Sequence, residues 1–463
     1  MPNNNNKRVL LFTFISFSLL LITSIASNYL AVYWPFIKNI DILSDIKLSQ
    51  VNYSKQQTFT KKQSGDGIDS LAYTTTIKTD SISFNQYLLP GRFVDFRSDT
   101  TQPVLPKFVN KLAALKRGER IKIRIAWFGD SLIEGDLITQ TVRELLQNEF
   151  AGNHGVGFVP FKSITAGFRT SATALTTGSW IDDNFKSKVY NDPLFFSGHV
   201  FYSSGGQFKL RDNTVKDSVQ VLEKWLVCGS ADSNTAIFVN KIKKTIAANS
   251  IFNRILIDKS KNNSFELTVP NRRVALYGVS SEPESGVIID NFSYRGISGF
   301  ELGKFDEKFL VDISKNSVYD LIVIQYGVNM MFRAKDTNYE YYKKGMDPVL
   351  KRIKYYLPNT DFLMVSCTDR AFRYGSEWKT AIGLDSLLKT QATLAFNNKI
   401  PFFNLYTTMG GNGTIVNWAS GPIRYASKDY IHASPKGALL LGKYFFNAFM
   451  IDYKKRQLKK AEK

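Results

Sequence analysis

A serine near residue 130 and an aspartate–histidine pair near residue 430 have the types and spacing that nucleophilic catalysis requires. Ser131 follows Gly129-Asp130 at the end of the apolar stretch 121–128 (IKIRIAWF), which predicts a buried strand. The segment Thr139–Phe150 predicts a helix after the turn. A serine at a strand-to-helix turn is held by the strand end and lies near the partial positive charge of a helix N-terminus. Gly129 would supply backbone angles that other residues avoid, so the turn favours a nucleophile at Ser131.

Histidine is scarce, which narrows the choice of a catalytic base to His154, His199 and His432. His154 lies in a glycine-rich stretch, where we interpret it as a loop residue. Asp429 stands three residues before His432, so a turn can bring both side chains to the same side. Asp429 would then hold the imidazole and stabilise its protonated form, while His432 takes the proton from the Ser131 hydroxyl.

Two further turns could stabilise an oxyanion. Asn329 ends the stretch 326–329 (YGVN), which follows the most apolar predicted strand, 319–326 (YDLIVIQY). Gly299 ends the stretch 296–299 (GISG). An asparagine amide and a backbone N–H are groups that hold a developing oxyanion. Glycine and asparagine are common after strands, so it is their combination with the serine and the histidine that predicts an acyl-transfer site.

The order of these blocks along the chain resembles that of the GDSL/SGNH hydrolase family. The GDSxxxG, glycine, GxN and DxxH blocks of the family match GDSLIEG at Ser131, GISG at Gly299, GVN at Asn329, and Asp429 with His432. The match spans residues 121–135 and 286–450. Met330 stands where many members have an aspartate after the asparagine, a difference that leaves the proposed role of Asn329 in place.

The resemblance implies a flavodoxin-like three-layer α/β/α fold and ester hydrolysis through an acyl-serine intermediate. It implies a catalytic triad of Ser131, Asp429 and His432. It also implies an oxyanion hole formed by the N–H groups of Ser131 and Gly299 and the side-chain amide of Asn329. We expect no cofactor and no metal ion in such a site.

The elements that must position these residues follow from the hydrophobic pattern. From Gly286 onwards predicted strands and helices alternate, which favours a parallel sheet covered on both faces, with the site at the carboxyl ends of the strands. Between 172 and 285, short alternating runs separated by turns predict an inserted β-sandwich-like module, either carbohydrate-binding or structural. The predicted organisation is therefore an N-terminal anchor or signal segment (1–34), a stalk or extension (35–105), an SGNH domain in two parts (106–171 and 286–452) around the module (172–285), and a basic tail (453–463).

The N-terminal segment predicts export. Val9–Trp34 contains no charged residue and follows Lys7-Arg8, which predicts a transmembrane helix with its N-terminus inside. The alternative is a signal peptide cleaved near Ser24-Ile25-Ala26. We favour the uncleaved anchor because the apolar run continues past that site. The catalytic domain would then be membrane-anchored in the bacterial periplasm or at the cell surface; after cleavage it would be secreted.

The formal net charge of +20 favours anionic surroundings such as a bacterial wall, an anionic glycan or lipid headgroups. Nucleic acid is not an expected partner, because the sequence has no zinc-finger spacing, RNP-like aromatic motif or P-loop. The two cysteines, Cys228 and Cys367, have no neighbour at metal-ligand spacing.

These features predict an exported serine esterase that removes O-acetyl groups from a cell-wall or extracellular polysaccharide. Within the family the chain is most similar to exported bacterial peptidoglycan or polysaccharide O-acetylesterases, on the inserted module and the stretches 413–420 (GTIVNWAS) and 428–434 (KDYIHAS). Two alternatives stay open. The same triad could transfer acetyl groups to a glycan, with a membrane-bound O-acyltransferase as partner, or the chain could be a non-catalytic wall-binding protein. A complete triad argues against the last.

Overall fold

The structure is a computed structural model that describes residue 15 and residues 84–461, apart from 217–218, 233–234, 271–273 and 317–318. Except for Ile15, the predicted anchor or signal segment (1–34) and the extension as far as residue 83 lie outside the described residues. Within the described part of the chain, no helix combines the length and the apolarity needed to cross a membrane.

A six-stranded sheet forms the centre of the α/β part. Its spatial order is β1-β17-β14-β13-β2-β12, and all neighbours are parallel except β1 and β17. The strands span Phe93–Val94 (β1), Lys122–Gly129 (β2), Gly286–Ser293 (β12), Leu321–Gln325 (β13), Asp361–Val365 (β14) and Phe402–Phe403 (β17). Counted along the chain, the five parallel strands lie in the order 2-1-3-4-5, which is the flavodoxin-like order. The predicted parallel sheet is confirmed.

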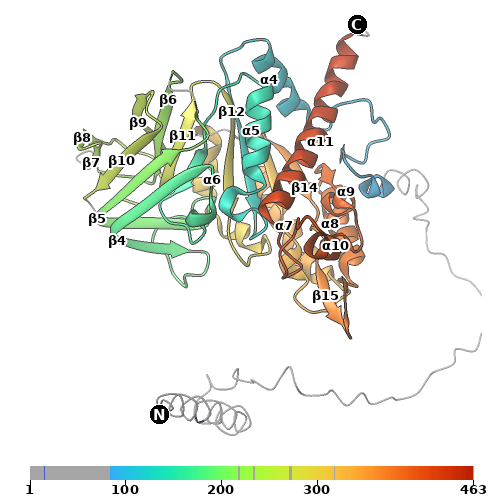
Figure 1. Cartoon of the computed structure of the whole chain (residues 1–463). Helices are drawn as coiled ribbons and strands as arrows, with labels where there is room; N and C mark the ends of the chain where they lie inside the picture. The colour runs from blue at the N-terminus through green and yellow to red at the C-terminus, as the bar shows by residue number, and fades with distance from the viewer. Residues whose placement is uncertain are drawn as a thin grey trace, which may run out of the picture. The chain divides into compact units, whose positions relative to one another are not determined.

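Helices cover both faces of this sheet (Figure 1). One face packs against α4 (Pro106–Lys116), α5 (Thr139–Glu149) and α11 (Pro435–Ala461). The other face packs against α6 (Glu307–Asn316), α7 (Glu340–Tyr356) and α8 (Leu384–Asn397). The shorter helices are α9 (Leu405–Met409), α10 (Thr414–Ser420) and the 3₁₀ turns η2 (Asn85–Leu88), η3 (Glu134–Asp136), η4 (Ala166–Phe168), η5 (Phe300–Lys304) and η6 (Val328–Met330).

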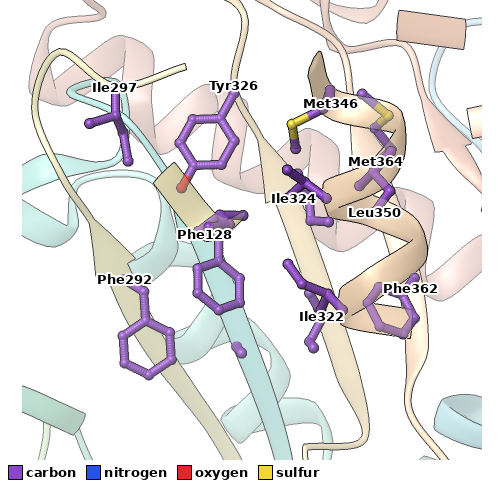
Figure 2. Close-up of a cluster of buried hydrophobic side chains, with 14 of the residues drawn as sticks. Phe128, Phe292, Ile297, Ile322, Ile324, Tyr326, Met346, Leu350, Phe362 and Met364 are labelled. Atoms are coloured by element: carbon purple, nitrogen blue, oxygen red, sulfur yellow. The ribbon is translucent and has the colours of Figure 1, made fainter. Parts of the chain in front are cut away.

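The alternation of side chains along β2 accounts for the two layers. Ile125 and Trp127 belong to the apolar cluster beneath α4, α5 and α11, whereas Phe128 belongs to the cluster beneath α6, α7 and α8. Figure 2 shows this second cluster, in which Ile324 of the neighbouring strand lies beside Met346 of α7. Because both faces are covered, apolar residues occur on both sides of these strands, and the resulting apolar runs indicated the strands in the sequence.

A second sheet contains nine strands joined by antiparallel pairing, and it branches at β5 and at β11. The strands span Gly157–Pro160 (β3), Ala172–Asn184 (β4), His199–Asp212 (β5), Leu222–Cys228 (β6), Ala236–Val239 (β7), Ile242–Thr245 (β8), Asn253–Ser260 (β9), Ser264–Val269 (β10) and Leu276–Pro283 (β11). The sheet begins before the predicted module boundary at residue 172, because β3 pairs with β11. A four-residue strand is too short to show this partnership in the sequence.

The second sheet shares an aromatic core with the α/β part. Phe195, from the connection between β4 and β5, has its ring centroid 5.0 Å from Phe158, 5.3 Å from Tyr277 and 5.3 Å from Phe292 of β12. In Figure 1 this sheet lies beside the β12 edge of the parallel sheet. The shared core holds the β-rich module against the part that carries Ser131, so the module is packed on that part and not joined to it only by a linker.

The predicted extension (35–105) ends in residues that pack on the α/β part. β1 pairs with β17, and the ring centroid of Phe93 lies 5.4 Å from that of Phe403 and 4.9 Å from that of Phe449. A two-residue strand has no periodicity to detect, which explains why the sequence pattern placed it in the extension.

Candidate active site

The predicted triad residues lie within hydrogen-bond distance of one another. Ser131 Oγ is 2.8 Å from His432 Nε2, and His432 Nδ1 is 2.6 Å from Asp429 Oδ2. Ser131 directly follows the end of β2, whereas Asp429 and His432 lie in the loop before α11. With Nδ1 hydrogen-bonded to a carboxylate, Nε2 is the nitrogen placed to accept the serine proton.

Backbone hydrogen bonds hold the turn between Asp429 and His432. Asp429 Oδ1 accepts the N–H groups of Ile431 and His432 at 3.0 and 3.1 Å. Partial burial raises the pKa of Asp429, but the hydrogen bonds from the His432 ring and from these two N–H groups outweigh burial and bring the pKa below its ordinary value. The carboxylate therefore stays charged beside the imidazole.

A short hairpin supports the same turn. Its strands are β15 (Ala371–Tyr374) and β16 (Glu377–Thr380). The Ala371 N–H donates to the Tyr430 carbonyl at 3.0 Å, and the Trp378 ring stacks on the Tyr430 ring with centroids 4.1 Å apart. Tyr430 has a φ of +58°, a left-handed conformation that is costly for a bulky residue. The hairpin thus stabilises a strained residue between two triad members, and no sequence pattern pointed to it.

Glycine is needed at position 129 for space. A Cβ at Gly129 would lie 2.8 Å from the Ile133 side chain and 3.0 Å from the Gln325 carbonyl oxygen. Gly129 is not among the glycines with positive φ, so the expected reason, an unusual backbone angle, was wrong. The close approach of β13 and the nucleophile turn excludes a side chain instead. The helix α5 begins at Thr139, after η3, so its N-terminus does not directly follow Ser131.

Asp130 fixes the nucleophile turn from inside the protein. It is fully buried, and its Oδ1 accepts the Leu132 N–H at 3.0 Å. Its Oδ2 has no hydrogen-bond partner among the described residues. Burial raises the pKa of Asp130 to about 7, and the nearby charge of Glu134 acts in the same direction. Asp130 is therefore placed to hold the turn, next to Ser131 but outside the predicted triad.

The two predicted oxyanion residues lie on connected loops. Asn329 Nδ2 donates to the Ile297 carbonyl at 2.9 Å, which ties the loop after β13 to the loop that carries Gly299. The amide has a second N–H that this bond does not use. Gly299 has a φ of +96°, and a Cβ there would lie 2.9 Å from the Tyr326 ring, so only glycine fits.

The backbone donors of the predicted oxyanion hole are the N–H groups of Ser131 and Gly299. Among the described residues, neither the Ser131 N–H nor the Gly299 N–H donates to a protein acceptor. An unpaired N–H pair beside a nucleophile is the arrangement that stabilises a tetrahedral intermediate. The turn that carries Asn329 receives one more contact, a hydrogen bond from Arg370 that the sequence did not reveal.

Other ionisable residues near the nucleophile have structural partners. Asp136 is buried and accepts two hydrogen bonds from Arg143, at 2.6 and 2.9 Å. Burial alone would raise the pKa of Asp136, but Arg143 and Arg169 hold it well below its ordinary range. The His154 N–H donates to the Gln220 side chain at 2.9 Å, as expected of a loop residue. The described residues contain no group of three or more His, Cys, Asp or Glu side chains that could hold a metal ion.

No family model and no curated protein matches the chain. Among solved structures, a peptidoglycan O-acetylesterase is similar with a TM-score of 0.65 at 18% identity, over 76% of this chain and 98% of that chain. A GDSL-like lipase from Parabacteroides merdae scores 0.27 at 20% identity, over 35% and 72% of the two chains. A family two carbohydrate esterase from Cellvibrio japonicus scores 0.26 at 8% identity, over 61% and 99%.

TM-scores below 0.5 do not establish a common fold, so the comparison of folds depends on the first of these structures. The likeness to it extends over nearly the whole of that chain and agrees with the flavodoxin-like strand order. The chain therefore shares the fold of this solved structure.

Proposed function

We propose that the chain is a serine esterase that removes O-acetyl groups from a cell-wall or extracellular polysaccharide. The observation that carries the proposal is the hydrogen-bonded series from Ser131 Oγ through His432 to Asp429. A solved structure that shares the fold is a peptidoglycan O-acetylesterase, which supports an acetylated glycan as the class of substrate.

In the first half of the proposed reaction, His432 Nε2 takes the proton of the Ser131 hydroxyl while Oγ attacks the acetyl carbonyl carbon. The Ser131 and Gly299 N–H groups and the Asn329 amide would stabilise the negative oxygen that forms. His432 then gives its proton to the leaving sugar oxygen, and the acetyl group remains on Ser131.

In the second half, water attacks the acetyl-serine, its proton goes to His432, and acetate leaves as Ser131 regains a proton. The side chains of His432 and Asp429 are 32% and 44% exposed, so water can reach the base. Transfer to a sugar hydroxyl would require that water be kept out. This exposure supports hydrolysis over acetyl transfer.

We also propose that the catalytic part is exported and tethered through Val9–Trp34, which would place it beside a bacterial wall. The net charge of +20 suits such anionic surroundings. An acetyltransferase with the same triad, partnered with a membrane-bound O-acyltransferase, is the competing proposal.

The test gives the purified full chain O-acetylated peptidoglycan and, separately, an O-acetylated soluble polysaccharide, and measures free acetate. We expect acetate from at least one of them, and we expect Ser131→Ala to lower the rate on the order of 10⁴-fold or more. Activity of Ser131→Ala within a few-fold of the parent would exclude the triad. Acetylated glycan in place of acetate, when excess acceptor glycan is added, would establish a transferase.

A further inference from the structure

A cavity of about 720 Å³ lies between the β-rich sheet and the loop after the nucleophile. Its walls include Glu134 of η3, inward-facing residues of β4, the start of β5, and residues 293–295 at the end of β12. The Glu134 N–H donates to the Ser131 carbonyl at 3.4 Å, so the cavity begins one backbone hydrogen bond from the nucleophilic residue. A cavity of this size fits a small-molecule ligand or about one or two sugar rings.

Two buried polar atoms in the cavity wall lack hydrogen-bond partners among the described residues. They are Ser197 Oγ and Arg169 Nη2, the second of which lies 3.4 Å from an Asp136 oxygen without forming a hydrogen bond. An unpaired buried polar group costs free energy. A hydroxyl or carboxylate oxygen of a ligand that reached these atoms would satisfy them.

A histidine held by its neighbours adds an oriented polar atom. His199 Nδ1 lies 2.7 Å from Asp182 Oδ1, and both residues line the cavity. The His199 ring also lies between Phe201 and Tyr294, with ring centroids 5.3 and 5.1 Å away. These contacts fix the ring and leave Nε2 as its remaining polar atom, which is suited to a hydroxyl group of a ligand.

The charges of the wall favour an anion. Glu134 forms an ion pair with Arg295 at 2.5 Å. The lysines Lys162 and Lys186, in contrast, have no carboxylate within ion-pair distance in the described parts of the chain. Lys162 Nζ lies 3.4 Å from a backbone carbonyl, and Lys186 Nζ lies 5.7 Å from the centre of the Tyr294 ring. Two cations without anionic partners therefore face the same cavity.

We propose that this cavity binds a carboxylate-bearing sugar of the polymer whose ester is cleaved at Ser131. Lys162 and Lys186 would face the carboxylate, and Ser197 and His199 would face hydroxyl groups. The identity of the polymer as substrate rests on the proposed function, whereas binding in the cavity needs no turnover. Because the cavity adjoins the loop after Ser131 and none of the three proposed triad residues lines it, it would supply binding energy for the polymer and leave the turnover of a small acetyl ester unchanged.

The test measures binding by calorimetry with the full chain carrying Ser131→Ala. The ligand is a tetrasaccharide of alternating N-acetylglucosamine and N-acetylmuramic acid that carries no O-acetyl groups. The matched ligand is the same tetrasaccharide with its carboxyl groups reduced to alcohols. We expect the carboxylate form to bind at least about tenfold more tightly, which corresponds to roughly 1.4 kcal/mol.

A second variant combines Ser131→Ala with Lys162→Gln and Lys186→Gln. In this variant we expect the preference for the carboxylate ligand to disappear. Lys188→Gln, which changes an exposed lysine of the same connection outside the cavity wall, should keep it. With Ser131 restored, the double lysine variant should hydrolyse 4-nitrophenyl acetate at the parent rate.

Three results would overturn the proposal. They are no binding of the tetrasaccharide, equal affinity for its two forms, and an affinity that does not change in the double lysine variant. The two proposals fail separately. If the carboxylate preference depends on the two lysines but no glycan releases acetate, only the esterase proposal fails. If acetate is released and the lysine variants bind as the parent does, only the cavity proposal fails.

Discussion

Arg370 Nη1 donates a hydrogen bond to the Val328 carbonyl oxygen at 2.9 Å, directly before Asn329 in the chain. This bond joins the segment after β14 to the turn after β13. The guanidinium also lies over the Phe372 ring, 4.6 Å from its centre. Its partial burial lowers the pKa of Arg370, although the group stays charged. Arg370 thus holds the turn of a predicted oxyanion donor, and its charge also interacts with Asp429.

Arg370→Ala should lower kcat for a small acetyl ester with little change in KM, because Asn329 would lose its support in the transition state. Removal of an oxyanion donor itself costs roughly 10²- to 10³-fold, so we expect a smaller loss, about 10-fold. Arg370→Lys should recover part of the rate. Arg373→Ala changes an exposed residue of β15 and serves as the control. A rise in KM without a fall in kcat would contradict this positioning role.

The choice of His432 as the base can be tested against His154. His432→Ala should lower kcat/KM for an acetyl ester on the order of 10⁴-fold and remove the rise of activity with pH, because a neutral imidazole accepts the serine proton. His154→Ala should change the rate by no more than a few-fold. The opposite pattern in these two variants would show that the DxxH block was assigned wrongly.

Asp130 predicts a pH dependence of stability. The folded chain binds its proton with a pKa of about 7, whereas an unfolded aspartate has a pKa of about 4. The raised pKa contributes stability that is complete below about pH 4 and is lost as the pH rises to about 7, on the order of 4 kcal/mol. Urea unfolding from pH 4.5 to 8 should show a smaller fall in the free energy of unfolding for Asp130→Asn than for the parent. If the free energy of unfolding fell by the same amount with pH in both proteins, Asp130 would not be the group that loses its proton.

Trp378 should affect catalysis through the Tyr430 ring. An aromatic pair contributes about 0.5 to 1.5 kcal/mol, so Trp378→Ala should lower kcat by roughly 2- to 10-fold. Trp378→Phe retains a ring and should stay near the parent rate. The measurement compares kcat of the two variants and the parent, and thermal unfolding checks that both variants are folded. Equal rates in both variants and the parent would mean that the stack does not position the turn.

The sequence could predict the parts of the fold that have a pattern of their own. The strands of the parallel sheet contain apolar runs, and the blocks at Ser131 and His432 follow from local residue types. The parts that the sequence missed depend on partners distant in the chain. β1 and β3 are short, and each is a strand only because β17 or β11 lies beside it.

The residues that hold the candidate site in place could not be predicted either, because their partners are also distant in the chain. Nothing near Trp378 indicates that it stacks on Tyr430, and nothing near Arg370 indicates a bond to Val328. Gly129 was identified correctly as a special position but for the wrong cause, since the limit on its side chain is set by Gln325 of another strand. Residue types suggest chemistry, whereas the residues that position it are set by tertiary contacts.

Ser131 and His432 are 301 positions apart in the chain. Doubling the length of a closed loop costs only roughly 0.6 kcal/mol, but contacts of high sequence separation tend to slow folding. A growing chain that has made every strand of the parallel sheet, up to Phe403, still lacks the base. The base comes into place as α11 packs, with the Phe445 ring centroid 4.6 Å from that of Trp127 on the strand before Ser131. A chain truncated before Asp429 would therefore contain every strand of the sheet and the proposed nucleophile, but it would lack both the proposed base and α11, one of the helices that cover one face of the sheet.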